Sequence, residues 1–124
     1  MKPARIATCA VLVLRIAYGV ALVADPRRLA LRWLGPAAED APAQVALRGL
    51  GAREVILHTG ALLATSRGDA VRPWLAASVA GDLADVIATA MGRRRLPPDS
   101  TPATAAVGGG AALTSVALAA AVDR

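Results

Sequence analysis

The side chains of this sequence that could do chemistry gather inside segments that are otherwise apolar. The stretch 48–58 reads Arg-Gly-Leu-Gly-Ala-Arg-Glu-Val-Ile-Leu-His, and it contains two arginines, a glutamate and the only histidine of the chain. A later apolar segment carries a pair of aspartates, and the first apolar segment carries one arginine. The candidate site residues are therefore Arg15, Arg48, Arg53, Glu54, His58, Asp82 and Asp85.

Some of these side chains share helix faces and could act together. Glu54 and His58 are spaced i, i+4, so they lie on one face of a helix. Asp82 and Asp85 are spaced i, i+3 and share a face in the same way. Carboxylates in this arrangement can accept protons or hold a ligand, and a histidine can change its charge near neutral pH. Two neighbouring carboxylates repel each other unless a basic side chain lies between them.

The arginines are the candidate partners of these carboxylates. Arg53 points away from Glu54 on its own helix, so we expect it to meet the aspartate pair of the next apolar segment. Arg15 is the other candidate partner, and Arg48, near a helix start, can reach the membrane interface. Two interpretations stay open: a ligand- or proton-binding site, and a structural salt-bridge network that fixes the helix register.

No cofactor or metal is expected from these residues. His58 has no second histidine or nearby cysteine to help hold a haem or a metal ion, and the arginines compete for the carboxylates. The sequence contains no phosphate loop, nucleophile elbow or zinc motif. The net charge of +5 does not indicate nucleic-acid binding, because the arginines are dispersed and aromatic residues are scarce.

The prolines divide the chain into segments long enough to cross a bilayer. The hydrophobic fraction, 56%, exceeds that of a typical soluble domain, and there is no phenylalanine to fill a soluble core. The long proline-free stretches each hold about the 20 residues that a spanning helix needs. Sustained period-2 alternation is absent, so strands are not expected. The predicted spans cover about 6–24, 43–66, 73–91 and 103–122.

We therefore predict an all-α fold, a four-transmembrane-helix up-down bundle that forms a single integral membrane domain over residues 1–124. Asp25 and Pro26 are typical of a helix N-cap and first position. The short basic helix that they open ends at Gly35 and carries Trp33, as expected of a helix at the membrane interface. An ordinary solvated loop helix is the alternative.

Charged residues inside the predicted spans restrict how the helices can be arranged. One such charge at mid-bilayer costs roughly 2.5–3.5 kcal/mol on insertion scales. The membrane interpretation therefore requires these residues to meet inside the bundle. A soluble helical bundle with charged surface faces is the alternative, and a cleaved signal peptide is disfavoured by Arg15 in its apolar core. The face of the first span that we expect to contact protein carries Thr8, Val11, Arg15, Tyr18 and Leu22.

Two motifs resemble a known family. Arg-Gly-Leu-Gly-Ala-Arg-Glu at 48–54 and Ala-Gly-Asp-Leu-Ala-Asp at 80–85, followed by a basic stretch with Leu-Pro, resemble an uncharacterised actinobacterial family of small four-helix integral membrane proteins that is loosely DoxX-like. The resemblance brings no established activity, and His58 lies outside its pattern. We expect a location in the bacterial plasma membrane. The signature positions that the resemblance implies are Arg48, Gly51, Arg53, Glu54, Asp82 and Asp85.

Three classes of function fit this sequence. We favour a non-catalytic accessory or scaffold protein in the lipid bilayer, as a homo-oligomer or with a partner membrane protein. The first alternative is a binding or transport module for a small molecule or protons, which predicts a water-accessible cavity beside Asp82 and Asp85. The second is a membrane enzyme acting on a lipid-soluble, quinone-like substrate, which predicts an apolar pocket beside the acids. The basic residues of the loops favour, by a narrow margin, a cytoplasmic side for the first and third loops.

Overall fold

The computed structural model describes residues 1–122, and its regular structure over that range is entirely helical. Two 3-10 turns and one short α-helix connect four long α-helices. The long helices agree with the four predicted segments to within a few residues at each end. The elements in chain order are α1 (Pro3–Ala24), α2 (Pro26–Leu34), η1 (Gly35–Glu39), α3 (Ala41–Arg67), α4 (Arg72–Met91), η2 (Arg93–Arg95) and α5 (Ser100–Ala121).

Local sequence signals set the ends of α2 as predicted. The Asp25 side chain accepts a hydrogen bond from the backbone N–H of Arg28 at 3.3 Å, and Pro26 occupies the first helical position. The helix ends at Gly35, whose φ of +65° is a conformation that residues with a Cβ rarely adopt. The chain can therefore reverse sharply at this point and return as η1 toward α3.

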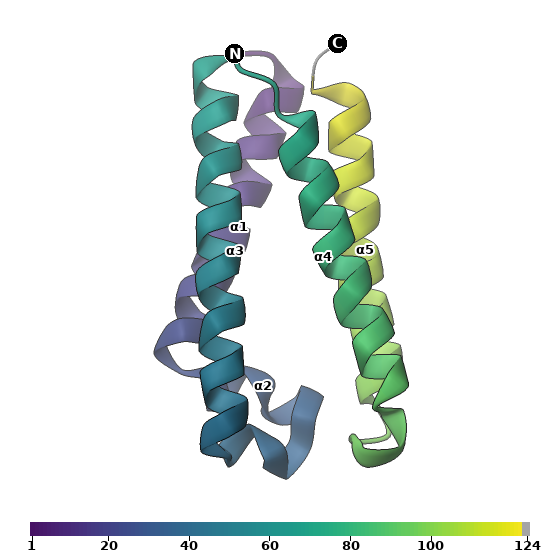
Figure 1. The fold of residues 1–124 in the computed structure, drawn as a ribbon. Coiled ribbons are helices and arrows are strands. Elements are labelled where there is room, and N and C mark those ends of the chain that lie inside the picture. Colours follow the sequence, from purple (N-terminus) through teal and green to yellow (C-terminus); the bar gives the residue numbers. More distant parts are fainter. Residues whose placement is uncertain (123–124) are drawn as a thin grey trace.

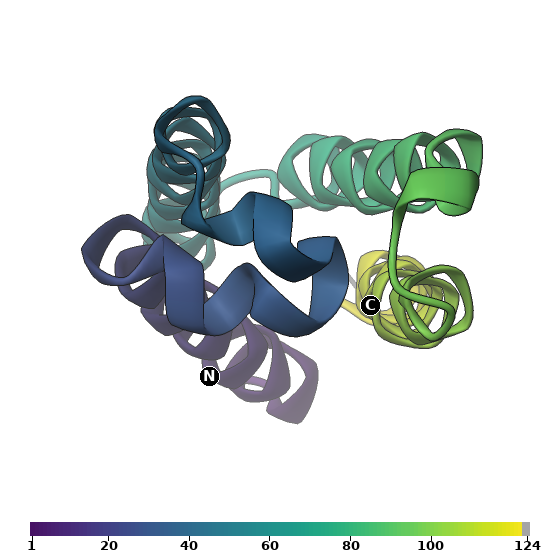
Figure 2. The ribbon, with the colours of Figure 1, turned by 90° about the horizontal axis from the view of Figure 1, so that it is seen from below.

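The long helices form two close pairs rather than an evenly packed bundle. α1 packs along α3, and α4 packs along α5, whereas contacts between the pairs are sparse. α3 and α4 are joined by a short turn, yet they diverge from it (Figure 1). Figure 2 shows α2 and η1 lying across the end of the bundle remote from that turn, between the two pairs. The two pairs are therefore linked at both ends and stand apart in the middle.

Glycines allow the helices of each pair to approach closely. A Cβ on Gly51 in α3 would lie 2.7 Å from the carbonyl oxygen of Gly19 in α1. A Cβ on Gly108 in α5 would lie 2.9 Å from a methyl group of Val86 in α4. Neither distance leaves room for a side chain, so these glycines fix the spacing within each pair. A Cβ on Gly109 would have no atom of another helix within 4 Å. In the glycine run of α5, close helix packing therefore requires a glycine only at Gly108.

Two small apolar clusters lie toward opposite ends of the molecule. One joins α2 and η1 to α1 and α3, and the other joins α3, α4 and the end of α5. The segment between them contains the ionisable residues. The buried members of the clusters are Leu22, Ala30, Ala38 and Leu47 at one end, and Ala64, Val71, Leu75 and Val122 at the other.

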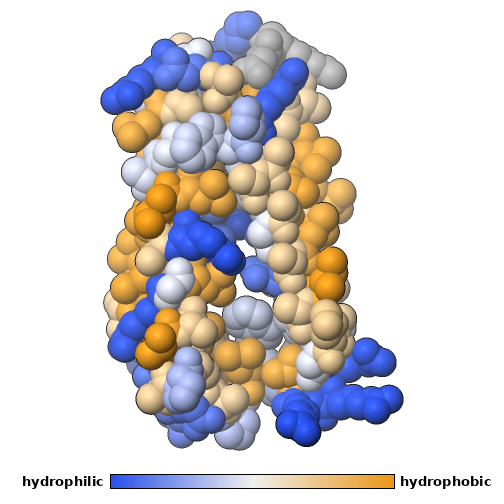
Figure 3. Space-filling view, in the orientation of Figure 1, coloured by the Kyte–Doolittle hydropathy of each residue, from blue (hydrophilic) through white to orange (hydrophobic). Residues whose placement is uncertain are grey.

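Three helices, α1, α4 and α5, are long and apolar enough to cross a membrane. Large apolar side chains point outward from the bundle, for example Ile56, which is 72% exposed, and Leu113, which is 73% exposed. In Figure 3 hydrophobic surface covers much of the middle of the molecule, while hydrophilic surface gathers at the two ends and along the gap between the helix pairs. This distribution is compatible with a membrane protein, because water-soluble monomers rarely expose extended apolar surface.

Candidate ligand-binding site

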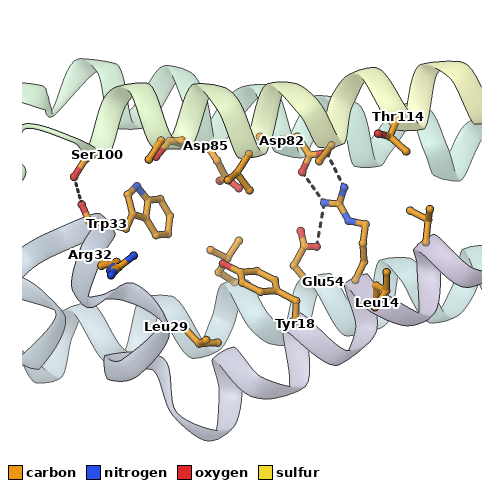
Figure 4. A pocket seen from close by; sticks show the side chains of 18 residues that line it. Leu14, Tyr18, Leu29, Arg32, Trp33, Glu54, Asp82, Asp85, Ser100 and Thr114 are labelled. Carbon is orange, nitrogen blue, oxygen red and sulfur yellow. Dashed lines mark hydrogen bonds and ion pairs between the residues drawn. The ribbon is translucent and has the colours of Figure 1, made fainter.

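Arg15 of α1 connects three helices through its guanidinium group. It forms two hydrogen bonds with Asp82 of α4, Nη1 to Oδ2 at 2.8 Å and Nη2 to Oδ1 at 2.6 Å (Figure 4). Its Nη2 also lies 3.3 Å from Oε2 of Glu54 in α3. The three side chains are only 16%, 7% and 10% exposed, in the order Arg15, Asp82, Glu54. The arginine therefore lies between two buried carboxylates that would otherwise repel each other.

His58 links α3 to α4 beside this group. Its Nδ1 lies 2.7 Å from the backbone oxygen of Glu54, and a carbonyl oxygen can only accept, so Nδ1 carries the proton. Its Nε2 forms a hydrogen bond of 2.9 Å with Oγ of Ser78. The side chain is buried, and both ring nitrogens have partners, with Nδ1 also 3.3 Å from Oε2 of Glu54. This geometry makes His58 a structural link and leaves no ring nitrogen open to a ligand.

Two of the predicted site residues, both arginines of α3, are exposed and lie outside the group. Arg48 is exposed, and its Nε donates a hydrogen bond of 3.1 Å to the carbonyl oxygen of Val23, near the C-terminal end of α1 where a positive charge is favourable. Arg53 is exposed and forms no ion pair with any residue in the range 1–122. The expected contact of Arg53 with the aspartate pair is not formed, because Arg53 lies on the exposed face of α3 while Glu54 and His58 are turned to the inside.

A cavity of about 480 Å³ lies between the two helix pairs. All five α-helices contribute to its lining, which consists mainly of apolar side chains. Arg15, Glu54, Asp82 and Asp85 form a polar region near its middle (Figure 4). Its volume falls within the range of roughly 300–1,000 Å³ that is common for small-molecule sites.

Asp85 differs from Asp82 although the two are one helical turn apart. It is half-buried and lines the cavity, and its carboxylate has no hydrogen-bond or ion-pair partner among the described residues. Its backbone carbonyl oxygen accepts a hydrogen bond of 2.7 Å from Thr89. Arg53 acts on it only at a distance, through its charge. Among the carboxylates that line the cavity, Asp85 is therefore the one open to a ligand.

The site residues predicted from the sequence did not include the aromatic part of the lining. Tyr18 was expected on the protein-facing face of the first span together with Arg15, and this shared face was the signal that could have placed it in the site. Trp33, which lies on the helix expected at the membrane interface, turns inward, and its Nε1 donates a hydrogen bond of 2.9 Å to Oγ1 of Thr89. No local signal indicates this, since it depends on how α2 crosses the end of the bundle.

No known protein family, curated protein or solved structure matches this chain. Fold and geometry therefore define its class: an all-helical protein with three helices long and apolar enough to cross a membrane, and a cavity between its helix pairs with a partly acidic lining. Within residues 1–122, no group of three or more His, Cys, Asp or Glu side chains is arranged to hold a metal ion.

Proposed function

We propose that this protein is a four-span integral membrane protein that binds a small lipid-soluble molecule between its helix pairs. The observation that carries the proposal is the cavity of about 480 Å³, which combines apolar walls with one unpaired carboxylate, that of Asp85. Such a combination suits a ligand that enters from the hydrocarbon phase and presents one polar group. The same cavity could serve a membrane enzyme, but no observation favours catalysis over binding.

The binding role also explains the polar residues better than a scaffold role does. Arg15, Asp82 and Glu54 satisfy one another and hold the helices together, as a scaffold would require. Asp85 adds nothing to that network, yet a carboxylate inside a bilayer is costly. A ligand that meets this carboxylate would account for its presence.

The charges of α3 do not prevent it from being the fourth span. Glu54 is turned inward and paired, and Arg48 lies near the start of the helix. Arg53 alone is exposed near mid-helix, and a long arginine side chain can extend its charged end toward polar surroundings. α3 also runs antiparallel to α1 along its length, so a bilayer that contains α1 contains α3 (Figure 1).

Four spans predict that both chain termini lie on one side of the membrane. A reporter of membrane sidedness fused in turn to each terminus should give the same result, since an even number of crossings returns the chain to its starting side. A reporter in the turn at Gly68 should agree with the termini, and one in the loop at Pro98 should not. Termini on opposite sides would show that one of the four helices does not cross.

Filling the cavity should weaken ligand binding without unfolding the protein. Ala111 lines the cavity, so Ala111→Leu is expected to weaken binding of the apolar probe bromonaphthalene by about tenfold or more. The exposed Ala117, on the same helix but outside the lining, provides the matched control Ala117→Leu.

The binding is measured as quenching of Trp33 fluorescence by the bromine atom of the probe. The second tryptophan, Trp74, packs on Gly60 outside the cavity, and it is replaced by phenylalanine so that only Trp33 is observed. In micelles of an uncharged maltoside detergent, quenching should saturate for the Ala117→Leu protein and not for the Ala111→Leu protein. Quenching that rises without saturation and equally in all proteins would reflect partition into the detergent, and it would refute the proposed function.

A further inference from the structure

The aromatic residues of this chain are concentrated at the cavity. The sequence contains one tyrosine, two tryptophans and no phenylalanine. Two of these three aromatic residues, Tyr18 and Trp33, line the cavity together with Asp85. Figure 4 shows the two rings and the carboxylate reaching into the same space from α1, α2 and α4. In a chain so poor in aromatic residues, this grouping indicates the chemistry of the ligand.

Hydrogen bonds hold Trp33 in place and leave the face of its ring free to contact a ligand in the cavity. Its indole N–H donates to Oγ1 of Thr89, so the ring has no free donor for a ligand. Its backbone oxygen accepts a hydrogen bond from Ser100 at the start of α5. Thr89 in turn donates to the backbone oxygen of Asp85, so one threonine fixes both the tryptophan ring and the helix turn that carries the carboxylate.

No basic side chain of the described residues forms an ion pair with Asp85. Arg15 is engaged by Asp82 and Glu54, and Arg53 forms no ion pair with Asp85. Arg32 lines the end of the cavity at α2, where its side chain is exposed. A cation inside the cavity would therefore find an open carboxylate with two aromatic rings around it.

From these contacts we propose that the ligand is a lipophilic cation of the alkylammonium class. This inference rests on the proposed function of the cavity. The ammonium group lies among Asp85, Tyr18 and Trp33, and the hydrocarbon part occupies the apolar walls. Aromatic rings attract an ammonium ion through their negative faces, and they do so most strongly where water is excluded. The carboxylate provides the opposite charge that an ammonium ion needs inside a membrane.

The experiment compares two ligands of nearly the same shape. Bromohexyl-trimethylammonium carries the positive charge, and its carbon isostere, in which a quaternary carbon replaces the nitrogen, is neutral. Both quench Trp33 through bromine, and both are titrated into the full chain carrying Trp74→Phe in micelles of an uncharged maltoside detergent. We expect the cation to bind at least about tenfold more tightly than the isostere.

Two variants test which carboxylate provides the preference. Asp85→Asn should remove most of the difference between the two ligands while keeping the shape of the cavity. Asp40→Asn changes an exposed carboxylate that forms no side-chain cap bond at the start of α3 and lies outside the lining, so it should leave the preference unchanged.

The outcomes separate this inference from the proposed function. Equal binding of cation and isostere, or a preference that survives Asp85→Asn, would overturn the inference while the binding function stands. Saturable quenching by neither ligand would overturn both. If Asp85→Asn fails to fold, the comparison of the two ligands on the Trp74→Phe protein with Asp85 intact still tests whether the cavity prefers the cation.

Discussion

Replacing Arg15 by leucine should lower the free energy of unfolding by about 3–5 kcal/mol, the usual cost of removing one partner of a buried ion pair. The change leaves the carboxylates of Asp82 and Glu54 buried, close together and without their shared partner. Titration of the protein in maltoside micelles with sodium dodecyl sulfate, followed by circular dichroism, measures the effect. The loss is expected to be large because this arginine bridges the two helix pairs where other contacts are few.

Arg53→Leu is the matched control for this substitution. Arg53 is exposed and lacks an ion-pair partner among the described residues, so its replacement should change the free energy of unfolding by less than about 1 kcal/mol. Similar losses for Arg15→Leu and Arg53→Leu would mean that the bidentate contact with Asp82 does not hold the fold together.

Replacing His58 by alanine should cost about 2–5 kcal/mol, the range seen when a large buried side chain is truncated. The imidazole is 1% exposed and fills the space between α3 and α4, so its removal leaves a void and an unpartnered Ser78 hydroxyl. The same denaturation titration measures this loss.

Ser78→Ala separates the hydrogen bond from the packing. It removes only the hydroxyl that is hydrogen-bonded to His58 Nε2, so a loss of about 1 kcal/mol in the free energy of unfolding is expected. If His58→Ala cost no more than Ser78→Ala, the imidazole would not be a packing element, and the interpretation of His58 as a structural link would be wrong.

The helices of this protein could be predicted well from its sequence because their limits are set locally. Proline positions, the cap at Asp25 and the glycine at Gly35 act within a few residues, and the structure places helix ends at or near these sites. The all-helical architecture is confirmed, with three helices apolar enough to cross a membrane. The fourth span, the DoxX-like resemblance and the bacterial plasma membrane stay predictions.

The meeting of Arg15, Glu54 and Asp82 could be predicted in outline from the cost of burying charge. Charges inside apolar helices are favourable where they face one another, and this argument groups Arg15, Glu54 and Asp82. It also expected Arg53 to join them, and in the structure Arg53 is exposed instead. It does not identify which aspartate receives the arginine. That choice depends on how the two helix pairs are placed relative to each other, which no local feature of the sequence indicates.

The rest of the site could not be predicted because it depends on the separation of the two helix pairs. Short connections indicate antiparallel neighbours, but they do not show that α3 and α4 diverge and leave a cavity. The inward turn of Trp33 follows from the way α2 crosses the end of the bundle. The outward direction of Arg53 follows from the α1–α3 contact, which turns Glu54 and His58 to the inside.

The central claim is that two aspartates one turn apart have different roles, Asp82 in the fold and Asp85 in the cavity. The most direct test measures detergent-induced unfolding and bromonaphthalene binding for Asp82→Asn and Asp85→Asn in parallel, both in the Trp74→Phe protein. Asp82→Asn should lower the free energy of unfolding by about 3 kcal/mol or more, because it breaks the bidentate pair with Arg15. Asp85→Asn should leave stability unchanged within about 1 kcal/mol and keep the apolar probe bound. Equal destabilisation by the two substitutions would contradict the account, since Asp85 would then belong to the structural network.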